Sequence, residues 1–287
     1  MNLPGPLALV TGSAAGFGLL TSIELAQAGW NVFATMRDPA RRDKIDAAAK
    51  AALVQDRIHV ERLDVTDQAS VDACARKVHE HGPLSVLVNN AGYGLGGFVE
   101  DVTLDELRAQ FETNFFGLVR VTKAFLPKMR ESRGGTIVNV SSVAGTIGGP
   151  GLSSYHSSKW AVEGWSESLR HELALFGVRV VLVEPGAFKT DIFERNRRVA
   201  ARCSDPSSPY FAMTQKLTKY VDDEVVKSAA DPLDVAQLIV SIARAENPLL
   251  RYPIGLDARV TILLKKLLPQ RVFLWAVSKT VAAKLRG

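Results

Sequence analysis

Short runs of aliphatic and β-branched residues alternate along the chain with longer stretches in which apolar residues recur every three or four positions. The short runs predict strands and the longer stretches predict amphipathic helices. Strands are expected at residues 7–11, 31–36, 57–63, 84–89, 136–141, 178–184 and 250–254. Residues 84–88 and 178–183 are almost wholly apolar, which is typical of strands covered on both faces. The pattern therefore predicts an α/β fold with a doubly wound, parallel, seven-stranded sheet.

These elements are expected to form one domain, because 287 residues with 47% hydrophobic content can bury a single large core. The domain is placed at residues 1–256, followed by a helical extension at 257–287. Its least regular part is 191–230, which is rich in Pro, Ser and charged residues and is expected to form a lid over a substrate site.

The net charge of +5 comes from the C-terminal extension. Residues 258–287 contain seven Lys or Arg and no acid, so the rest of the chain carries a net charge of −2. A mildly acidic body argues against nucleic acid as a partner.

The cysteines, histidines and apolar runs exclude several other classes of protein. Cys74 and Cys203 stand far apart and the histidines have no metal-ligand spacing, so we expect neither a disulfide framework nor a metal site. The first residues show no charged segment followed by a long apolar run, and no stretch has 18 apolar residues, so we expect neither secretion nor a membrane span. The sequence predicts a cytoplasmic protein.

A glycine-rich segment, Thr-Gly-Ser-Ala-Ala-Gly-Phe-Gly at residues 11–18, follows the first strand and opens the first helix. Gly12 would allow a tight turn, and Gly16 and Gly18 would let a pyrophosphate approach the backbone at the positive helix N-terminus. The spacing differs from the common G-x-G-x-x-G pattern, so a glycine-rich turn without a ligand stays an alternative.

Tyr155 and Lys159 stand four residues apart in a predicted helix and therefore share one face. A nearby ammonium favours the tyrosinate and would lower the pKa of the phenol. The simpler alternative is a surface Tyr and Lys on an amphipathic helix.

Taken together, the motifs at 11–18, 89–92 (Asn-Asn-Ala-Gly), Asn114, Ser142, 155–159 and 185–190 resemble those of the short-chain dehydrogenase/reductase family. They occur in the family's order, and Ser142 precedes Tyr155 by the family's thirteen positions. The stretch Ala-Thr-Met-Arg-Asp at 34–38 and the length of the lid are similar to the hydroxysteroid and retinol dehydrogenase branch. This resemblance implies a Rossmann-type fold with strand order 3-2-1-4-5-6-7, NAD(P)-dependent interconversion of an alcohol and a carbonyl, and assembly as a homodimer or homotetramer.

The same resemblance implies a role for each catalytic residue. Tyr155 would be the general acid/base, and Lys159 would lower its pKa and bind the nicotinamide ribose. Ser142 would hold the substrate oxygen. Asn114 would hold a water that links Lys159 to solvent, although a mid-helix Asn alone would more often be solvated or bonded to its own helix.

The resemblance also implies a cofactor site along the carboxyl ends of the strands. Asp64 would bind the adenine amine, with a helix N-cap as its alternative role. The residues expected to contact the cofactor are Gly12, Ser13, Gly16, Phe17, Gly18, Arg37, Asp64, Val65, Asn90, Ala91, Gly92, Tyr155, Lys159, Pro185, Gly186, Phe188 and Thr190.

The end of the second strand predicts a preference for NADP(H). Met36 stands where an acid would select NAD(H), and Arg37 could stack on adenine and pair with a 2′-phosphate. Arg41 and Arg42 are expected on a helix surface. Asp38 supports the opposite preference if the strand ends one residue later.

The substrate site is expected to be apolar and roomy, which favours a bulky hydrophobic carbonyl or alcohol. Its candidate residues, each of which could equally be ordinary core, are Leu95, Phe98, Gly148, Leu152, Phe188, Phe193, Tyr210, Phe211 and Met213. Two alternatives remain: a catalytically silent NAD(P) sensor, and a sugar-nucleotide epimerase, which the glycine spacing disfavours.

The C-terminal extension is expected to form two helices broken at Pro269. In the second helix an apolar stripe faces away from Arg271, Lys279 and Arg286, and Trp275 lies at its edge. The stripe consists of Phe273, Leu274, Val277, Val281 and Leu285. It could pack on the body or on a neighbouring subunit, or it could make a weak, salt-sensitive contact with a membrane.

Overall fold

The structure, a computed structural model that describes residues 3–190 and 197–286, is built around one parallel sheet. Its strand order is β3-β2-β1-β4-β6-β7-β9, which is the predicted order 3-2-1-4-5-6-7. The strands are β1 (Leu7–Thr11), β2 (Asn31–Met36), β3 (Ile58–Arg62), β4 (Val86–Asn89), β6 (Thr136–Val140), β7 (Arg179–Pro185) and β9 (Arg251–Ile254). The predicted α/β fold and seven-stranded sheet are confirmed.

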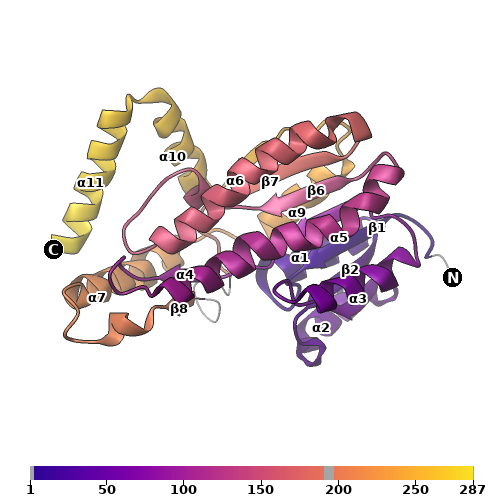
Figure 1. Cartoon of the computed structure of the whole chain (residues 1–287), viewed down its shortest axis with the longest axis horizontal. Coiled ribbons are helices and arrows are strands. Elements are labelled where there is room, and N and C mark those ends of the chain that lie inside the picture. The colour runs from indigo at the N-terminus through magenta and orange to yellow at the C-terminus, as the bar shows by residue number, and fades with distance from the viewer. Residues whose placement is uncertain (1–2, 191–196, 287) are drawn as a thin grey trace.

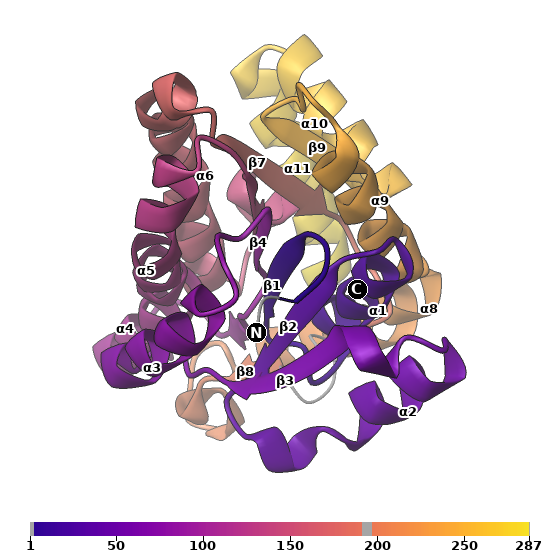
Figure 2. The same cartoon turned by 90° about the vertical axis from the view of Figure 1, so that its right-hand side faces the viewer.

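Helices cover both faces of this sheet (Figures 1 and 2). One face carries α1 (Gly16–Gln27), α2 (Asp43–Ala51) and α9 (Leu233–Arg244). The other carries α3 (Gln68–His79), α5 (Gly117–Glu131) and α6 (Ser153–Leu173). A further helix, α4 (Leu104–Phe111), runs into α5 through a π-helical turn at Glu112–Phe116.

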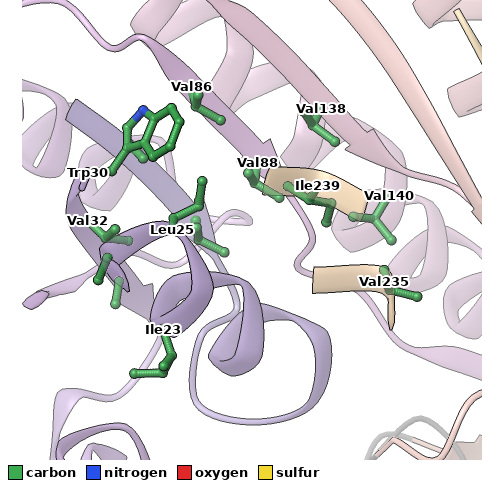
Figure 3. Packing of buried hydrophobic residues seen from close by; sticks show 14 of the residues in the cluster. Ile23, Leu25, Trp30, Val32, Val86, Val88, Val138, Val140, Val235 and Ile239 are labelled. Carbon is green, nitrogen blue, oxygen red and sulfur yellow. The ribbon is translucent and has the colours of Figure 1, made fainter. Parts of the chain in front are cut away.

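The alternation of side chains along each strand divides the core into two layers. In β1, Ala8 and Val10 pack toward α1 and α9, whereas Leu7 and Leu9 pack toward α3 and α5. Figure 3 shows the first layer, where valines of β4 and β6 lie with Ile239 of α9. Because both faces are buried, apolar residues at every position of the inner strands are stabilising.

The N-terminus of α1 differs from those of α3 and α4. Asp67 caps α3 by accepting a hydrogen bond from the Ala69 N–H, and Thr103 and Glu106 form a capping box on α4. Helix α1 follows Ala15, which provides no side-chain cap, and its first turn holds no acid. The first N–H groups of α1 therefore remain available to a ligand at the carboxyl edge of the sheet.

A second, two-stranded sheet was not expected from the sequence. It pairs β5 (Gly94–Gly96) in parallel with β8 (Arg197–Val199). Beyond it, the predicted lid is more regular than expected, because residues 211–228 form α7 (Phe211–Tyr220), a π-helical turn at Val221–Val225 and α8 (Val226–Ser228).

The C-terminal extension forms α10 (Leu256–Leu267) and α11 (Gln270–Arg286), with the predicted break at Pro269. Helix α11 lies against α7, as Figure 1 shows at the left of the molecule. Phe273 of the predicted stripe is buried, but Leu274, expected to share that face, is 53% exposed. The side chain of Leu285 lies outside the described residues. Among residues 3–190 and 197–286, no helix combines the length and apolar character needed to cross a bilayer.

Candidate active site

A cavity of about 660 Å³ lies along the carboxyl ends of the strands of the main sheet. Most residues predicted to bind a cofactor or to act in catalysis line it. These are Gly12, Gly16, Phe17, Arg37, Asp64, Val65, Asn90, Ala91, Gly92, Ser142, Tyr155, Lys159, Pro185, Gly186, Phe188 and Thr190. Three predicted residues, Ser13, Gly18 and Asn114, lie behind its wall.

The glycines of the turn at residues 11–18 have two different roles. Gly12 and Gly16 line the cavity with positive φ angles of 73° and 56°, a backbone conformation that glycine adopts without strain. Gly18 instead packs on the turn itself, because a Cβ there would lie 2.3 Å from the Gly12 carbonyl oxygen. Gly18 therefore lets α1 approach the turn closely, and its contact with a pyrophosphate stays a prediction.

Ser13 also holds the turn together from behind. It is fully buried, its hydroxyl donates to the Val10 carbonyl at 3.0 Å, and it accepts from the Ser22 hydroxyl at 3.1 Å. These bonds fix the backbone between β1 and α1.

Asn90 fastens the loop after β4 to the same turn. Its amide Nδ2 donates to the Thr11 carbonyl at 2.8 Å, and the Thr11 hydroxyl accepts from the N–H groups of Asn90 and Ala91. The two loops that border the cavity are thus joined directly, which sets the width of the space between them.

Ser142, Tyr155 and Lys159 form one wall of the cavity. Ser142 caps a short turn, Val143–Gly145, and accepts from the Ala144 N–H at 3.1 Å. The Nζ of Lys159 lies 5.8 Å from the centre of the Tyr155 ring and donates to the Val140 carbonyl at 2.9 Å. Helix α6 therefore aims the phenol and the ammonium at the same region, as their spacing predicted.

The electrostatics of this wall differ from the expectation in one respect. Burial raises the pKa of Tyr155, and a hydrogen bond with Ser142 partly opposes the rise. Burial also lowers the pKa of Lys159 to about 8, although the Glu163 carboxylate opposes this. The loss of water around the phenol therefore has a larger effect on the Tyr155 pKa than the nearby ammonium of Lys159.

Asn114 lies in the π-helical turn and is 2% exposed. Its Oδ1 accepts from the Tyr93 N–H at 3.1 Å, and its Nδ2 donates to the Tyr93 carbonyl at 3.0 Å and to Ser158 at 3.2 Å. The side chain is thus neither solvated nor bonded to its own helix: it positions the loop after β4. A water relay to Lys159 stays a prediction.

This arrangement matches a known family. Residues 6–200 match the family described as short chain dehydrogenase. The chain belongs to the short-chain dehydrogenase family. It is an NAD(P)-dependent oxidoreductase of the retinol dehydrogenase-like branch.

Relatives and solved structures agree with this assignment. An oxidoreductase named YusZ from Bacillus subtilis is 41% identical over 279 residues, which are 97% of each chain. Human retinol dehydrogenase 8 is 36% identical over 256 residues, 85% of this chain and 79% of its own. A 3-ketodihydrosphingosine reductase from Bacteroides thetaiotaomicron is 36% identical over 248 residues, 86% of this chain and 87% of its own.

The crystal structure of a short-chain dehydrogenase from Streptomyces avermitilis covers 99% of this chain and 96% of its own, with a TM-score of 0.79 and 34% identity. A short-chain dehydrogenase/reductase from Burkholderia phymatum in complex with NAD covers 93% of this chain and 94% of its own, with a TM-score of 0.76 and 27% identity. A serine dehydrogenase with NADP+ covers 86% of this chain and 94% of its own, with a TM-score of 0.72 and 27% identity.

Tyr93 and Arg198 are among the residues of this dehydrogenase's cavity that the sequence analysis missed. The Arg198 guanidinium lies 4.3 Å from the centre of the Tyr93 ring, and both residues line the cavity. Tyr93 could have been noticed because it directly follows the Asn-Asn-Ala-Gly motif. Arg198 carries no comparable signal, because only the second sheet brings β8 next to β5.

The end of β2 places more positive charge at the cavity than expected. Strand β2 ends at Met36, as predicted, and Arg41 lines the cavity together with Arg37. Arg41 is exposed in the short helical turn Pro39–Arg41, as expected, and it borders the cavity as well. Arg42 also lies on the surface, in an ion pair with Asp46 at 2.7 Å.

A buried pair of carboxyl groups, Glu163 and Glu184, lies close to the wall formed by Ser142, Tyr155 and Lys159. Glu163 stands one helical turn after Lys159 and is 6% exposed, while Glu184 of β7 is 1% exposed. Arg251 of β9 contacts both carboxyl groups, with its Nε 2.9 Å from Glu163 and 3.5 Å from Glu184. Burial and the neighbouring Glu163 raise the pKa of Glu184 to about 7.

This pair makes stability depend on pH in the opposite sense to most acidic side chains. Because the folded pKa of Glu184 lies above its ordinary value of 4.5, the folded state binds more protons between pH 4.5 and 7. Stability should fall as the pH rises through this window, by on the order of 1–3 kcal/mol or several degrees in Tm. In Glu184→Gln this fall should largely disappear when Tm is measured against pH.

Glu167→Gln is the matched control, because Glu167 binds the same Arg251 but is exposed, and Arg251 lowers its pKa. Its variant should keep the wild-type fall between pH 4.5 and 7. If Glu184→Gln keeps that fall as well, Glu184 is not the group that titrates.

Proposed function

We propose that this short-chain dehydrogenase uses NADP(H) to interconvert a carbonyl and an alcohol on a bulky hydrophobic substrate, with Tyr155 as the general acid/base. The observation that carries the proposal is the shared cavity: the wall formed by Ser142, Tyr155 and Lys159 continues into the glycine turn. A group bound along the turn would therefore reach the phenol. We propose that the protein works in the cytoplasm.

The residues present fit a nicotinamide dinucleotide. The uncapped N-terminus of α1 and the turn at Gly12 and Gly16 suit a pyrophosphate. Asp64 lines the cavity after β3, where its Oδ1 accepts from the Thr66 N–H at 2.9 Å in a local turn. When bound, the cofactor supplies or accepts the hydride at the substrate carbon.

The chain's own residues handle the proton and the charge on the substrate oxygen. In reduction, the Tyr155 hydroxyl donates its proton to the carbonyl oxygen, and in oxidation the tyrosinate removes that proton from the alcohol. Ser142 donates a hydrogen bond to the same oxygen, where negative charge develops. Lys159, with a pKa of about 8, is largely charged at neutral pH, and we assign it the ribose and the tyrosinate as partners.

Charge complementarity supports NADP(H) over NAD(H). Arg37, Arg41 and Lys44 line the cavity after β2, and Met36 occupies the place of a ribose-binding acid. Asp38 also lines the cavity, but its Oδ1 accepts from the Ala40 N–H at 3.0 Å. A 2′-phosphate would pair with the cations at this edge.

Arg37→Ala should weaken NADPH binding about 10- to 100-fold, which corresponds to one charge-assisted hydrogen bond, and should change NADH binding only a few-fold. Fluorescence titration with both cofactors measures the effect. Arg42→Ala, which removes a surface arginine paired with Asp46, should leave both affinities unchanged. Tighter NADH than NADPH binding by the wild type would contradict the preference.

Phe188 supports a hydrophobic substrate, because among the described residues it is the member of the predicted substrate set that lines the cavity. Leu95 packs as core with Tyr93, Ala200 and Cys203, and Phe98 stacks on Tyr210 with ring centres 4.9 Å apart. Phe193 lies outside the described residues. Two relatives are named for retinol and for a ketodihydrosphingosine, which are both largely apolar.

A substrate panel tests this proposal. With NADPH, the enzyme should reduce long-chain, retinoid or steroid carbonyls with a kcat/KM at least about tenfold above that for small sugars, because each buried methylene contributes about 0.8 kcal/mol. The reverse panel uses the matching alcohols with NADP+. Activity confined to small hydrophilic sugars would refute the substrate class.

We further propose a homodimer or homotetramer. Leu104 at the start of α4 and Phe116 at the end of the π-helical turn are 67% and 49% exposed, and a second copy could cover them. Sedimentation velocity measures the mass of this assembly.

A further inference from the structure

The outward face of α10 is apolar and uncovered. Leu256, Val260, Leu263, Leu264 and Leu267 are 79%, 44%, 54%, 43% and 70% exposed. At 100° per residue they fall within an arc of about 100°. Ala258 and Ile262, on the opposite side, are the buried residues of α10 and hold it to the body. This helix therefore presents its larger apolar surface to the outside.

Cations border this face. Arg259 and Lys266 follow one edge of the apolar arc, and both are exposed. The negative charge nearest to the face in sequence, Asp257, is used internally, because its Oδ2 accepts from the Ala187 N–H at 2.7 Å. Residues 258–287 contain no other acid to balance these cations.

The first turns of α11 also expose apolar side chains beside cations. Val272 is 46% exposed and Trp275 is 62% exposed, while Arg271 and Lys279 are exposed beside them. Trp is the side chain that favours the boundary between lipid headgroups and acyl chains. By contrast, Phe273 of the stripe predicted from the sequence is buried, so that stripe is not the outward surface.

We propose that the outward face of α10, together with Val272 and Trp275, docks on an anionic lipid surface. Leucines enter the headgroup boundary, and Arg259, Lys266, Arg271 and Lys279 bind the lipid phosphates and carboxylates. This inference goes beyond the proposed reaction and does not depend on it.

A second copy of the chain is a poorer occupant for two reasons. A twofold interface would bring the cationic edge of α10 against the same surface of its partner, where like charges repel. The face also offers five side chains from α10, whereas a stable protein interface uses about 20–30 residues per partner. An anionic surface has neither problem.

The face is connected through α11 to α7, the helix of the predicted lid (Figure 1). Helix α11 lies against α7. Helix α7 in turn covers the turn at Gly151, where a Cβ would lie 2.6 Å from Leu217 Cδ2. Gly151 accepts from the Gly97 N–H at 2.7 Å, next to Phe98. Docking would thus hold the lid helix close to the lipid, where apolar molecules are concentrated.

Vesicle flotation of the full chain tests the proposal, with phosphatidylcholine vesicles that contain or lack phosphatidylserine. Wild type should float with the anionic vesicles, less so at high salt. The double variant Leu263→Glu/Leu267→Glu should bind at least about tenfold more weakly, because two leucines lose their burial and two carboxylates meet an anionic surface. Arg259→Ala/Lys266→Ala should reduce binding and its salt dependence.

The matched control is Leu53→Glu/Leu175→Glu, which adds the same two charges at leucines that are 85% and 83% exposed. Leu175 follows the C-terminal end of α6, and Leu53 follows α2, so both are far in the chain from α10. This control should float like wild type. Equal thermal melts of all variants exclude unfolding as the cause.

Three results would overturn the proposal. The first is the absence of wild-type binding to anionic vesicles at low salt, and the second is equal binding by wild type and Leu263→Glu/Leu267→Glu. The third is a lower oligomer mass for that variant in sedimentation velocity without lipid, which would make a second copy the occupant of this face.

Discussion

Tyr155→Phe should lower kcat by about 10³-fold or more on any substrate that the wild type turns over, while NADPH affinity changes less than threefold. The phenol lines the cavity together with Ser142. Tyr155 and Lys159 are the titratable side chains of this wall. Phenylalanine keeps the ring and its packing but cannot donate or accept that proton. Steady-state kinetics and a separate cofactor titration measure the two effects.

Tyr252→Phe is the control for this change. Its hydroxyl accepts from the Leu249 N–H at 3.0 Å before β9, away from the cavity lining, so its removal should leave kcat within about twofold. If Tyr155→Phe retains more than a tenth of wild-type turnover, Tyr155 is not the general acid/base. A wild type that binds cofactor but converts nothing in the panel would support the sensor alternative.

Gly18→Ala should destabilise the fold by about 3 kcal/mol and weaken the binding of both cofactors at least tenfold. The added Cβ would lie 2.3 Å from the Gly12 carbonyl oxygen and 2.6 Å from Asn90 Nδ2, so α1 or the turn must move. Neither contact can yield by rotating a flexible side chain, because Asn90 is held by Thr11. Thermal melts and cofactor titrations show both effects.

Gly164→Ala provides the comparison within α6. A Cβ at Gly164 meets nothing within 4 Å, so alanine should stabilise this helix by about 0.5–1 kcal/mol. The proposed packing role of Gly18 would be wrong if Gly18→Ala melted like wild type and bound both cofactors normally.

Local sequence determined much of this protein. The apolar runs predicted the strands of the main sheet, because burial on both faces of a parallel sheet demands them. Helical spacing placed Tyr155 and Lys159 on one face, and the structure puts both on the cavity wall. The break at Pro269 was also predictable, because proline lacks the N–H that a continuing helix uses.

Other features depend on which distant segments meet. The packing of Gly18 against the Gly12 carbonyl and Asn90 could not be predicted, because Asn90 is distant in the sequence. Arg198 reaches the cavity only because β8 pairs with β5. The pKa of Glu184 is raised because the surrounding core removes water from its carboxyl group and because the charge of Glu163 lies nearby.

The two C-terminal helices show both a feature set by local sequence and a feature set by the tertiary structure. The sequence predicted an apolar stripe on the second helix, since a stripe depends only on spacing along one helix, and the stripe of the first helix was not predicted. Which stripe is covered depends on the surface that the rest of the fold offers to each helix. The tertiary structure buries Phe273 of α11 and leaves Leu256, Leu263 and Leu267 of α10 exposed.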